Sequence, residues 1–197
     1  GYHGYHITDF LKVDRHFGDE EVLEELIEKA HNLGLKVILD FVPNHTSHKH
    51  PFFLEAQEDK NSPYYDWYNF FDWPNDYEKF CGVPELPTLN TDNREVREAV
   101  IYEQPLHWLL EYDIDGLRLD YAYGPSHDFW TEFRKVIKSH KPEAYIYLVK
   151  SGRAQVKLKS LKVNLMVVLI FLWCGHLENC LFTKVNKYLN LSLTWII

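Results

Sequence analysis

The stretch YDIDGLRLDYAYG, residues 112–124, decides which fold this chain is expected to adopt. Ile114 to Leu119 predict a short buried strand, and such a strand is normally apolar throughout. This one carries Arg118 and ends in Asp120, and a strand places residues at i and i+2 on one face. Arg118 can pair with Asp120 and keep it ionised, because a guanidinium does not give up its proton. Such a carboxylate can act as a nucleophile, although an ion pair without chemistry is the commoner explanation of the pair alone.

The segments on either side predict alternating helices and strands. Residues 19–33 begin with acidic side chains and continue with apolar residues at helical spacing, with Gly34 as the cap. An apolar strand is predicted over 36–42, and a further strand over 144–149. Helices are predicted over 93–112, where Pro105 should kink or break the helix, and after Pro125-Ser126.

This order of elements predicts an α/β fold. Repeating βα units with charged residues at strand ends are typical of a TIM (β/α)8 barrel, whose active site lies at the carboxyl ends of the strands. About three of the eight strands can be identified, so we expect a partial barrel. Its segments are predicted as 1–45 and 94–149, with an insertion after the first complete strand and an atypical tail over 150–197.

The predicted insertion, residues 46–93, is rich in aromatic side chains. Residues 52–80 alone contain eleven Phe, Trp or Tyr. A long irregular insertion in a compact domain is usually functional, and aromatic faces pack well on sugar rings. A surface subdomain that packs its own aromatic side chains is an equally weighted alternative.

The overall composition excludes some classes of partner. The net charge of −8 makes nucleic acid an unexpected partner. The three cysteines give neither a disulfide framework nor a metal-binding spacing. The apolar run Leu165 to Cys174 is too short to span a membrane, so no membrane association is predicted. The chain begins inside a motif, at Gly1-Tyr2, which we interpret as the start of a fragment.

Three blocks of sequence resemble the α-amylase family of retaining glycoside hydrolases. Gly116 to Asp120 is similar to the strand that carries the family's nucleophile. Residues 40–45, DFVPNH, resemble its other signature strand end, and residues 2–5, YHGY, its early sugar-stacking loop. The order and spacing of the blocks also match. Residues 86–90, LPTLN, resemble the motif that closes the family's insertion, in particular in its neopullulanase-like branch.

This resemblance implies a role for each matched residue. Asp120 would be the nucleophile and Arg118 would keep it ionised and oriented. His45 would hydrogen-bond the sugar in the cleaved-residue subsite, and Tyr5 would stack on its ring. Asn44 matches a position that binds calcium in many members of the family, although one amide oxygen is a poor calcium site alone. The expected substrate is an α-glucan or oligosaccharide with α-glucosidic bonds, such as starch-like glucans or maltooligosaccharides.

The family's general acid is missing from this sequence. Retaining glycosidases need two carboxyl groups about 5–5.5 Å apart, and in the family a Glu-Val-Trp follows the strand predicted at 144–149. Here Lys150-Ser151-Gly152 follows instead. These residues can be encoded AAG-TCT-GGN, and the same bases read from one G earlier give GAA-GTC-TGG, which is Glu-Val-Trp. Glu143 precedes the strand and is expected at the wrong end of the barrel.

The tail also differs from the rest of the chain in composition. Residues 151–197 hold six Lys or Arg and one acid, Glu178, and no Asp occurs after Asp128. We therefore interpret the residues from about Lys150 onward as an out-of-frame or unspliced translation. The chain is expected to be an incomplete glycosidase fragment without activity as written. A non-catalytic relative of the family, or a pseudogene or gene-model product, remains the alternative.

Overall fold

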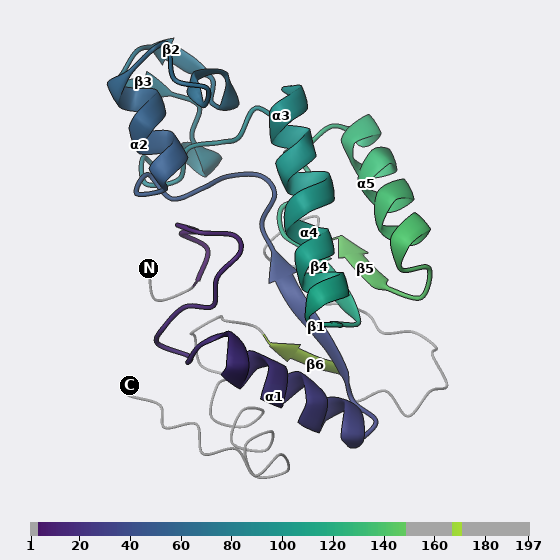
Figure 1. Ribbon diagram of the computed structural model, residues 1–197. Helices are drawn as coiled ribbons and strands as arrows, with labels where there is room; N and C mark the ends of the chain where they lie inside the picture. The colour runs from purple at the N-terminus through teal and green to yellow at the C-terminus, as the bar shows by residue number, and fades with distance from the viewer. Residues whose placement is uncertain (1–3, 149–166, 171–197) are drawn as a thin grey trace.

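The computed structural model of the chain describes residues 4–148 and 167–170 (Figure 1). Its main sheet has four parallel strands in the order β5-β4-β1-β6. Three belong to the predicted barrel segments: β1 (Lys36–Phe41), β4 (Gly116–Leu119) and β5 (Tyr145–Leu148). Their parallel pairing and the helices between them confirm the α/β fold and the partial (β/α)8 barrel.

The fourth strand, β6 (Val167–Ile170), comes from the predicted tail. It pairs in parallel with β1, from Lys36 opposite Val167 to Leu39 opposite Ile170. The other residues of the segment 150–197 lie outside the described part of the chain. The hypothesis that this segment is translated out of frame therefore stays a prediction.

The helices begin and end where the capping residues predict. Helix α1 (Glu20–Asn32) starts at Asp19, whose side chain accepts a hydrogen bond from the backbone N–H of Val22, and it is followed by Gly34 with φ +73°. Helix α5 (His127–His140) starts at Ser126 in the same way. Among the described residues, no helix is long and apolar enough to cross a membrane.

The helix between the insertion and β4 differs from its prediction. It runs through α3 (Arg94–Arg97), η3 (Glu98–Glu103), α4 (Gln104–Leu106) and η4 (His107–Glu111) without interruption. Pro105 was expected to kink or break it, and the expected break is wrong. The segments η3 and η4 are π-helical, so the hydrogen bonds on both sides of Pro105 shift to a wider spacing, which accommodates a residue without an N–H donor.

The insertion is a small folded unit with its own aromatic packing. It contains α2 (Pro51–Glu58), η1 (Tyr65–Trp67), the antiparallel pair β2 (Phe70–Asp72) and β3 (Asp76–Tyr77), and η2 (Phe80–Gly82). Phe53 is fully buried and packs edge-on against Tyr68 and Tyr77, each at 4.8 Å between ring centroids. Most of these aromatic side chains therefore stabilise the insertion.

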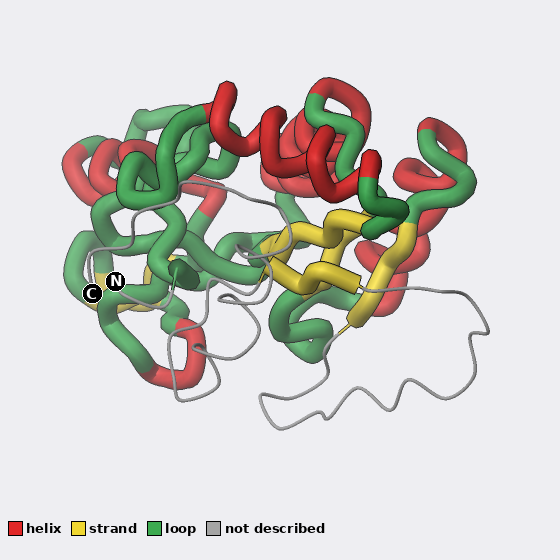
Figure 2. The backbone as a smooth tube through the Cα atoms, turned by 90° about the horizontal axis from the view of Figure 1, so that it is seen from below, coloured by secondary structure: helices red, strands yellow, loops and turns green. Residues whose placement is uncertain are grey.

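The arrangement places the insertion beyond the carboxyl ends of β1 and β4 (Figure 1). The barrel helices lie along one side of the strands, as Figure 2 shows from below. The core between strands and helices includes fully buried Val37, Leu117, Leu119, Phe129 and Phe133. This layering leaves the carboxyl ends of the strands as the edge where polar side chains from different segments meet.

Candidate active site

Two signature blocks meet at the carboxyl ends of β1 and β4. These strands pair in register from Ile38 opposite Gly116 to Phe41 opposite Leu119. The backbone N–H of Asp120 continues the ladder by donating to the carbonyl of Phe41 at 2.9 Å. Asp120 and the block that ends in His45 therefore lie at the same end of neighbouring parallel strands, as predicted.

Arg118 stands between two partly buried carboxylates. Its Nη1 lies 2.8 Å from Oδ1 of Asp120, which is the pair that the sequence predicts. The same nitrogen lies 2.7 and 3.0 Å from the two carboxyl oxygens of Asp40 on β1. The three side chains keep only 11–18% of their surface exposed. One guanidinium thus serves both carboxylates in a largely water-excluded place.

Tyr5 joins this cluster from the N-terminal loop. Its hydroxyl donates to Oδ2 of Asp40 at 2.9 Å and accepts from Nη1 of Arg118 at 3.1 Å. The guanidinium also lies 5.9 Å from the centroid of the Tyr5 ring. The structure brings Tyr5 to Arg118 and adds a contact that the sequence does not indicate, since its hydroxyl is held by Asp40.

Burial and pairing have opposite effects on the two carboxyl groups. Burial raises the pKa of Asp40 to about 6, while Arg118 and the Tyr5 hydroxyl favour its ionised form and the nearby Asp120 charge disfavours it. Burial also raises the pKa of Asp120, against the lowering effect of Arg118 and of the Tyr121 backbone N–H. Asp120 therefore keeps a raised pKa although it is paired with Arg118.

An aromatic contact links the insertion to both strand ends. The imidazole of buried His45 stacks on the ring of Phe80 at 4.5 Å. Phe80 in turn packs edge-on against Tyr121, the residue after Asp120, at 4.6 Å. The insertion is closed by the predicted motif: the N–H of Leu89 donates to the carbonyl of Asn44 at 2.9 Å. The insertion thereby borders the site.

Asn44 is buried beside the loop that follows Asp120. It keeps 2% of its surface exposed, and its Nδ2 lies 3.3 Å from Nδ1 of His45. Its Oδ1 is directed at the backbone of Gly124. A polar cavity of about 390 Å³ adjoins it, lined among others by Asn69, Glu78, Asn90, Asp92 and Tyr121.

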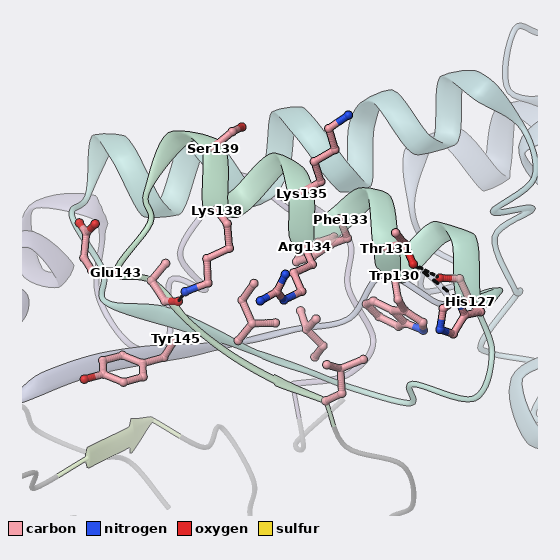
Figure 3. Close-up of a pocket in the computed structure, with 14 residues that line it drawn as sticks. His127, Trp130, Thr131, Phe133, Arg134, Lys135, Lys138, Ser139, Glu143 and Tyr145 are labelled. Atoms are coloured by element: carbon pink, nitrogen blue, oxygen red, sulfur yellow. Dashed lines mark hydrogen bonds between the residues drawn. The ribbon is translucent and has the colours of Figure 1, made fainter. Parts of the chain in front are cut away.

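A larger cavity lies elsewhere. It measures about 980 Å³ and is formed between α5 and β5, with Phe133, Ile146 and Leu148 in its wall (Figure 3). Figure 3 shows Glu143 at the far end of this groove from His127, which begins α5. Glu143 therefore lies at the amino end of β5, as expected, and is not placed to act with Asp120. The position expected for the acid, Lys150, lies outside the described residues.

Three residues of the site are absent from the sequence-based prediction. Asp40 is a carboxylate inside an otherwise apolar strand, the same signal that identifies Arg118 and Asp120, and it could have been found that way. Phe80 and Tyr121 carry no such signal, because one of many aromatic residues in an insertion cannot be singled out by spacing. Phe80 and Tyr121 are recognised only by their ring contacts in the folded protein, Phe80 with His45 and Tyr121 with Phe80.

Comparison with known proteins identifies relatives of this arrangement. The family model "Alpha amylase, catalytic domain" matches residues 2–157. Alpha-amylase 2 of Dictyoglomus thermophilum is 41% identical over 146 residues, which are 74% of this chain and 25% of that protein. A cyclomaltodextrinase of Thermoanaerobacter pseudethanolicus is 41% identical over 152 residues, 73% of this chain and 26% of that protein.

Solved structures show the same similarity. The type III pullulan hydrolase from Thermococcus kodakarensis superposes with a TM-score of 0.70 at 40% identity. The superposed part is 74% of this chain and 27% of the hydrolase chain. Ttha1563 from Thermus thermophilus superposes with a TM-score of 0.69 at 39% identity. The chain spans about a quarter of the length of the curated relatives that it matches.

Proposed function

This chain belongs to the α-amylase family, and from that premise we infer that it is part of a retaining glycoside hydrolase acting on α-glucosidic bonds. Its relatives include a maltogenic α-amylase of Bacillus acidopullulyticus, cyclomaltodextrinases and a neopullulanase. We therefore propose starch-like glucans, maltooligosaccharides or cyclodextrins as the substrate class of the complete protein.

One observation supports the chemistry most strongly: the position of Arg118 between Asp40 and Asp120. In this proposal Asp120 attacks the anomeric carbon and forms a covalent glycosyl-enzyme, while the glycosidic oxygen leaves with a proton from a general acid. Water then releases the sugar with retained configuration. Arg118 keeps Asp120 ionised and directs its carboxylate, which is the orientation that attack requires.

The sugar would be bound by the residues that surround Asp120. His45 borders the site on the insertion side and is proposed to hydrogen-bond a sugar hydroxyl. Tyr5 is proposed to stack its ring on the sugar, because its hydroxyl is engaged by Asp40 and the ring is the part of the side chain suited to a sugar face. This arrangement keeps the hydroxyl of Tyr5 in the protein and leaves the ring as its contribution to binding.

We further propose that the 197-residue chain does not turn over substrate. A missing acid typically removes about 10² to 10⁴ of the rate, and the strand that should supply it continues into Lys150. If Lys150-Ser151-Gly152 are encoded AAG-TCT-GGN, a form with one G inserted before codon 150 carries Glu-Val-Trp there, and we refer to it as the frame-restored form.

Both forms should be assayed on maltooligosaccharides, whose glycosidic oxygen must be protonated by an acid as it leaves. The proposal expects cleavage by the frame-restored form and none by the 197-residue chain. Comparable turnover by the two forms would show that the acid lies elsewhere. Sequencing the transcript across codon 150 decides independently between a gene-model product and a genuine tail.

Calcium remains a proposal for the complete protein. Asn44 is the proposed ligand, and the adjoining cavity offers amide, hydroxyl and carboxylate oxygens, the ligand types that calcium prefers. The described residues hold no cluster of three or more His, Cys, Asp or Glu side chains suited to a metal. Calcium would contribute there by joining the insertion to the barrel. A rise in melting temperature on adding calcium, abolished in Asn44→Ala, tests it.

A further inference from the structure

We infer that Asp40 is a positioning residue for Asp120: through Arg118 it fixes the direction of that carboxylate and couples the ionisation of the two groups. This inference deepens the proposed function, because it concerns the proposed nucleophile. Its basis is the contact of one guanidinium nitrogen with three carboxyl oxygens.

The strand register explains why Asp40 can act in this way. Asp40 and Arg118 are Cα partners across β1 and β4, so they lie at the same level of the sheet. Asp120 follows two residues later, one step nearer the carboxyl end. Asp40 therefore holds the guanidinium from below with both oxygens, and the same Nη1 reaches one oxygen of Asp120 above. Without Asp40, only Asp120 and the Tyr5 hydroxyl of this cluster would fix the guanidinium.

The charges of the cluster do not balance. Two carboxylates and one guanidinium carry a net charge of −1 when both acids are ionised. Their oxygens contact a common nitrogen, so they cannot be further apart than the sum of two hydrogen-bond lengths. Like charges this close, in a place with little water, titrate as a pair with macroscopic pKa values that belong to both. The ionisation of Asp40 should therefore be felt by Asp120.

The groups that act on Asp40 come from the N-terminal loop and from β4. Tyr5 contributes a hydroxyl from the N-terminal loop, and β4 contributes Arg118 and Asp120. Tyr147 on β5 is the Cα partner of Arg118 on the other side of β4. Asp40 is the group with the higher proton affinity of the pair, with a pKa of about 6. As the pH rises, Asp40 should ionise after Asp120. The ionisation of Asp40 should then shift the NMR signal of the Asp120 carboxyl carbon.

The test reads ionisation rather than turnover. The 197-residue chain, labelled with ¹³C at the aspartate carboxyl carbons, is titrated by NMR from pH 3 to pH 8. Asp40→Asn keeps the shape of the side chain and removes its charge. Tyr5→Phe removes one hydrogen bond from ionised Asp40 and leaves every charge in place. Asp115→Asn is the matched control, since it neutralises a buried carboxylate just before β4, at the opposite end of the strands.

The inference expects two inflections in the Asp120 signal of the unmodified chain, the upper one at the pH where Asp40 titrates. That upper inflection should disappear in Asp40→Asn and persist in Asp115→Asn. In Tyr5→Phe it should move to higher pH in the Asp40 and Asp120 signals together. If Asp40→Asn does not fold, the Tyr5→Phe titration still tests whether Asp40 and Asp120 titrate together.

A single inflection for Asp120 in the unmodified chain would overturn the inference. So would a Tyr5→Phe variant in which the Asp40 inflection moves and the Asp120 signal does not follow. Both results are independent of glycosidase activity. The coupling can therefore fail while the proposed hydrolase function stands, and an inactive complete protein would leave the coupling intact.

Discussion

The side-chain oxygen of Asn44 fills the space that a side chain on Gly124 would need. A Cβ added to Gly124 would lie 1.7 Å from Oδ1 of Asn44 and 2.8 Å from its Cγ. Asn44 follows β1 and Gly124 follows Asp120, so this contact fixes the distance between the two loops that border the site. Asn44 is itself held by Leu89 through its backbone carbonyl, which leaves it little freedom to withdraw.

Gly124→Ala should therefore destabilise the protein by about 1–3 kcal/mol through overpacking. Chemical denaturation measures the loss. Asn44→Ala removes the atoms that the new methyl group would strike, so the double variant should lose clearly less than the sum of the two single losses. Strict additivity in this double-mutant cycle would show that the two residues do not constrain each other.

The pKa of Asp40 predicts how the stability of the chain changes with pH. Its value of about 6 in the folded state lies above the usual 3.8, so its contribution to stability is complete below pH 4 and is lost as the pH rises through 6. A difference of about two pH units corresponds to about 3 kcal/mol. Relative to the unmodified chain, Asp40→Asn should gain up to that amount between pH 4 and pH 7 in urea unfolding. Parallel stability curves for the two proteins would contradict it.

Asp115, at the amino ends of the same strands, should behave in the opposite way. It lies 2.7 Å from Nε2 of His31, and it accepts from Lys36 Nζ at 2.6 Å and the Val37 N–H at 2.8 Å. Burial raises the pKa of Asp115. The contacts with Lys36, the Val37 N–H and His31 outweigh burial and lower it. Its stabilisation is present above its unfolded pKa and is lost as the pH falls.

Asp115→Ala should cost about 3 kcal/mol at pH 7, because it leaves the Val37 N–H without its acceptor and Lys36 without its partner. The same variant should cost less at pH 3, because the stabilisation from the lowered pKa of Asp115 declines once the pH falls below the unfolded value of 3.8. Urea midpoints at the two pH values measure the difference. An equal loss at both would mean that the charge of Asp115 does not matter.

Local signals in the sequence predicted the elements that carry the site. Asp19 and Ser126 cap helices where expected, and apolar strands precede Asn44 and Asp120. These features depend on a few neighbouring residues, so periodicity and capping chemistry reveal them. The pair of Arg118 and Asp120 was predicted for the same reason, since a strand places i and i+2 on one face.

The missing parts depend on contacts between distant segments. Asp40 and Arg118 are 78 positions apart, and only the register of β1 against β4 makes them partners. The π-helical turns around Pro105 change the hydrogen-bond spacing without changing the apolar pattern, so the sequence predicted a break instead. The packing of Phe80 between His45 and Tyr121 arises from how the insertion folds back, which no local pattern encodes.

Two substitutions separate the two contacts of Tyr5. Tyr5→Phe removes the hydroxyl that bonds Asp40 and keeps the ring, whereas Tyr5→Ala removes both. In the frame-restored form, Tyr5→Ala should weaken maltooligosaccharide binding by roughly 1–3 kcal/mol, the value of a lost ring contact. Tyr5→Phe should bind within about 0.5 kcal/mol of the unmodified protein, because the ring stays in place. Calorimetry measures both, and equal losses for the two variants would assign binding to the hydroxyl.

The position of Asp120 predicts where a covalent intermediate forms. A 5-fluoro-α-glucosyl fluoride carries a leaving group that needs little protonation, and its second fluorine slows release of the bound sugar. With the frame-restored form, we expect one added sugar per chain, located by mass spectrometry on the peptide that contains Asp120. Asp120→Asn should not be labelled, because an amide cannot form the ester, whereas Asp115→Asn should be labelled, since its change lies at the other end of the strands. Arg118→Lys should be labelled more slowly, because an ammonium on a different stem cannot reproduce the contacts of the guanidinium with Asp40 and Asp120. Label on any carboxylate other than Asp120 would refute its assignment as the nucleophile, whatever the assay of turnover shows.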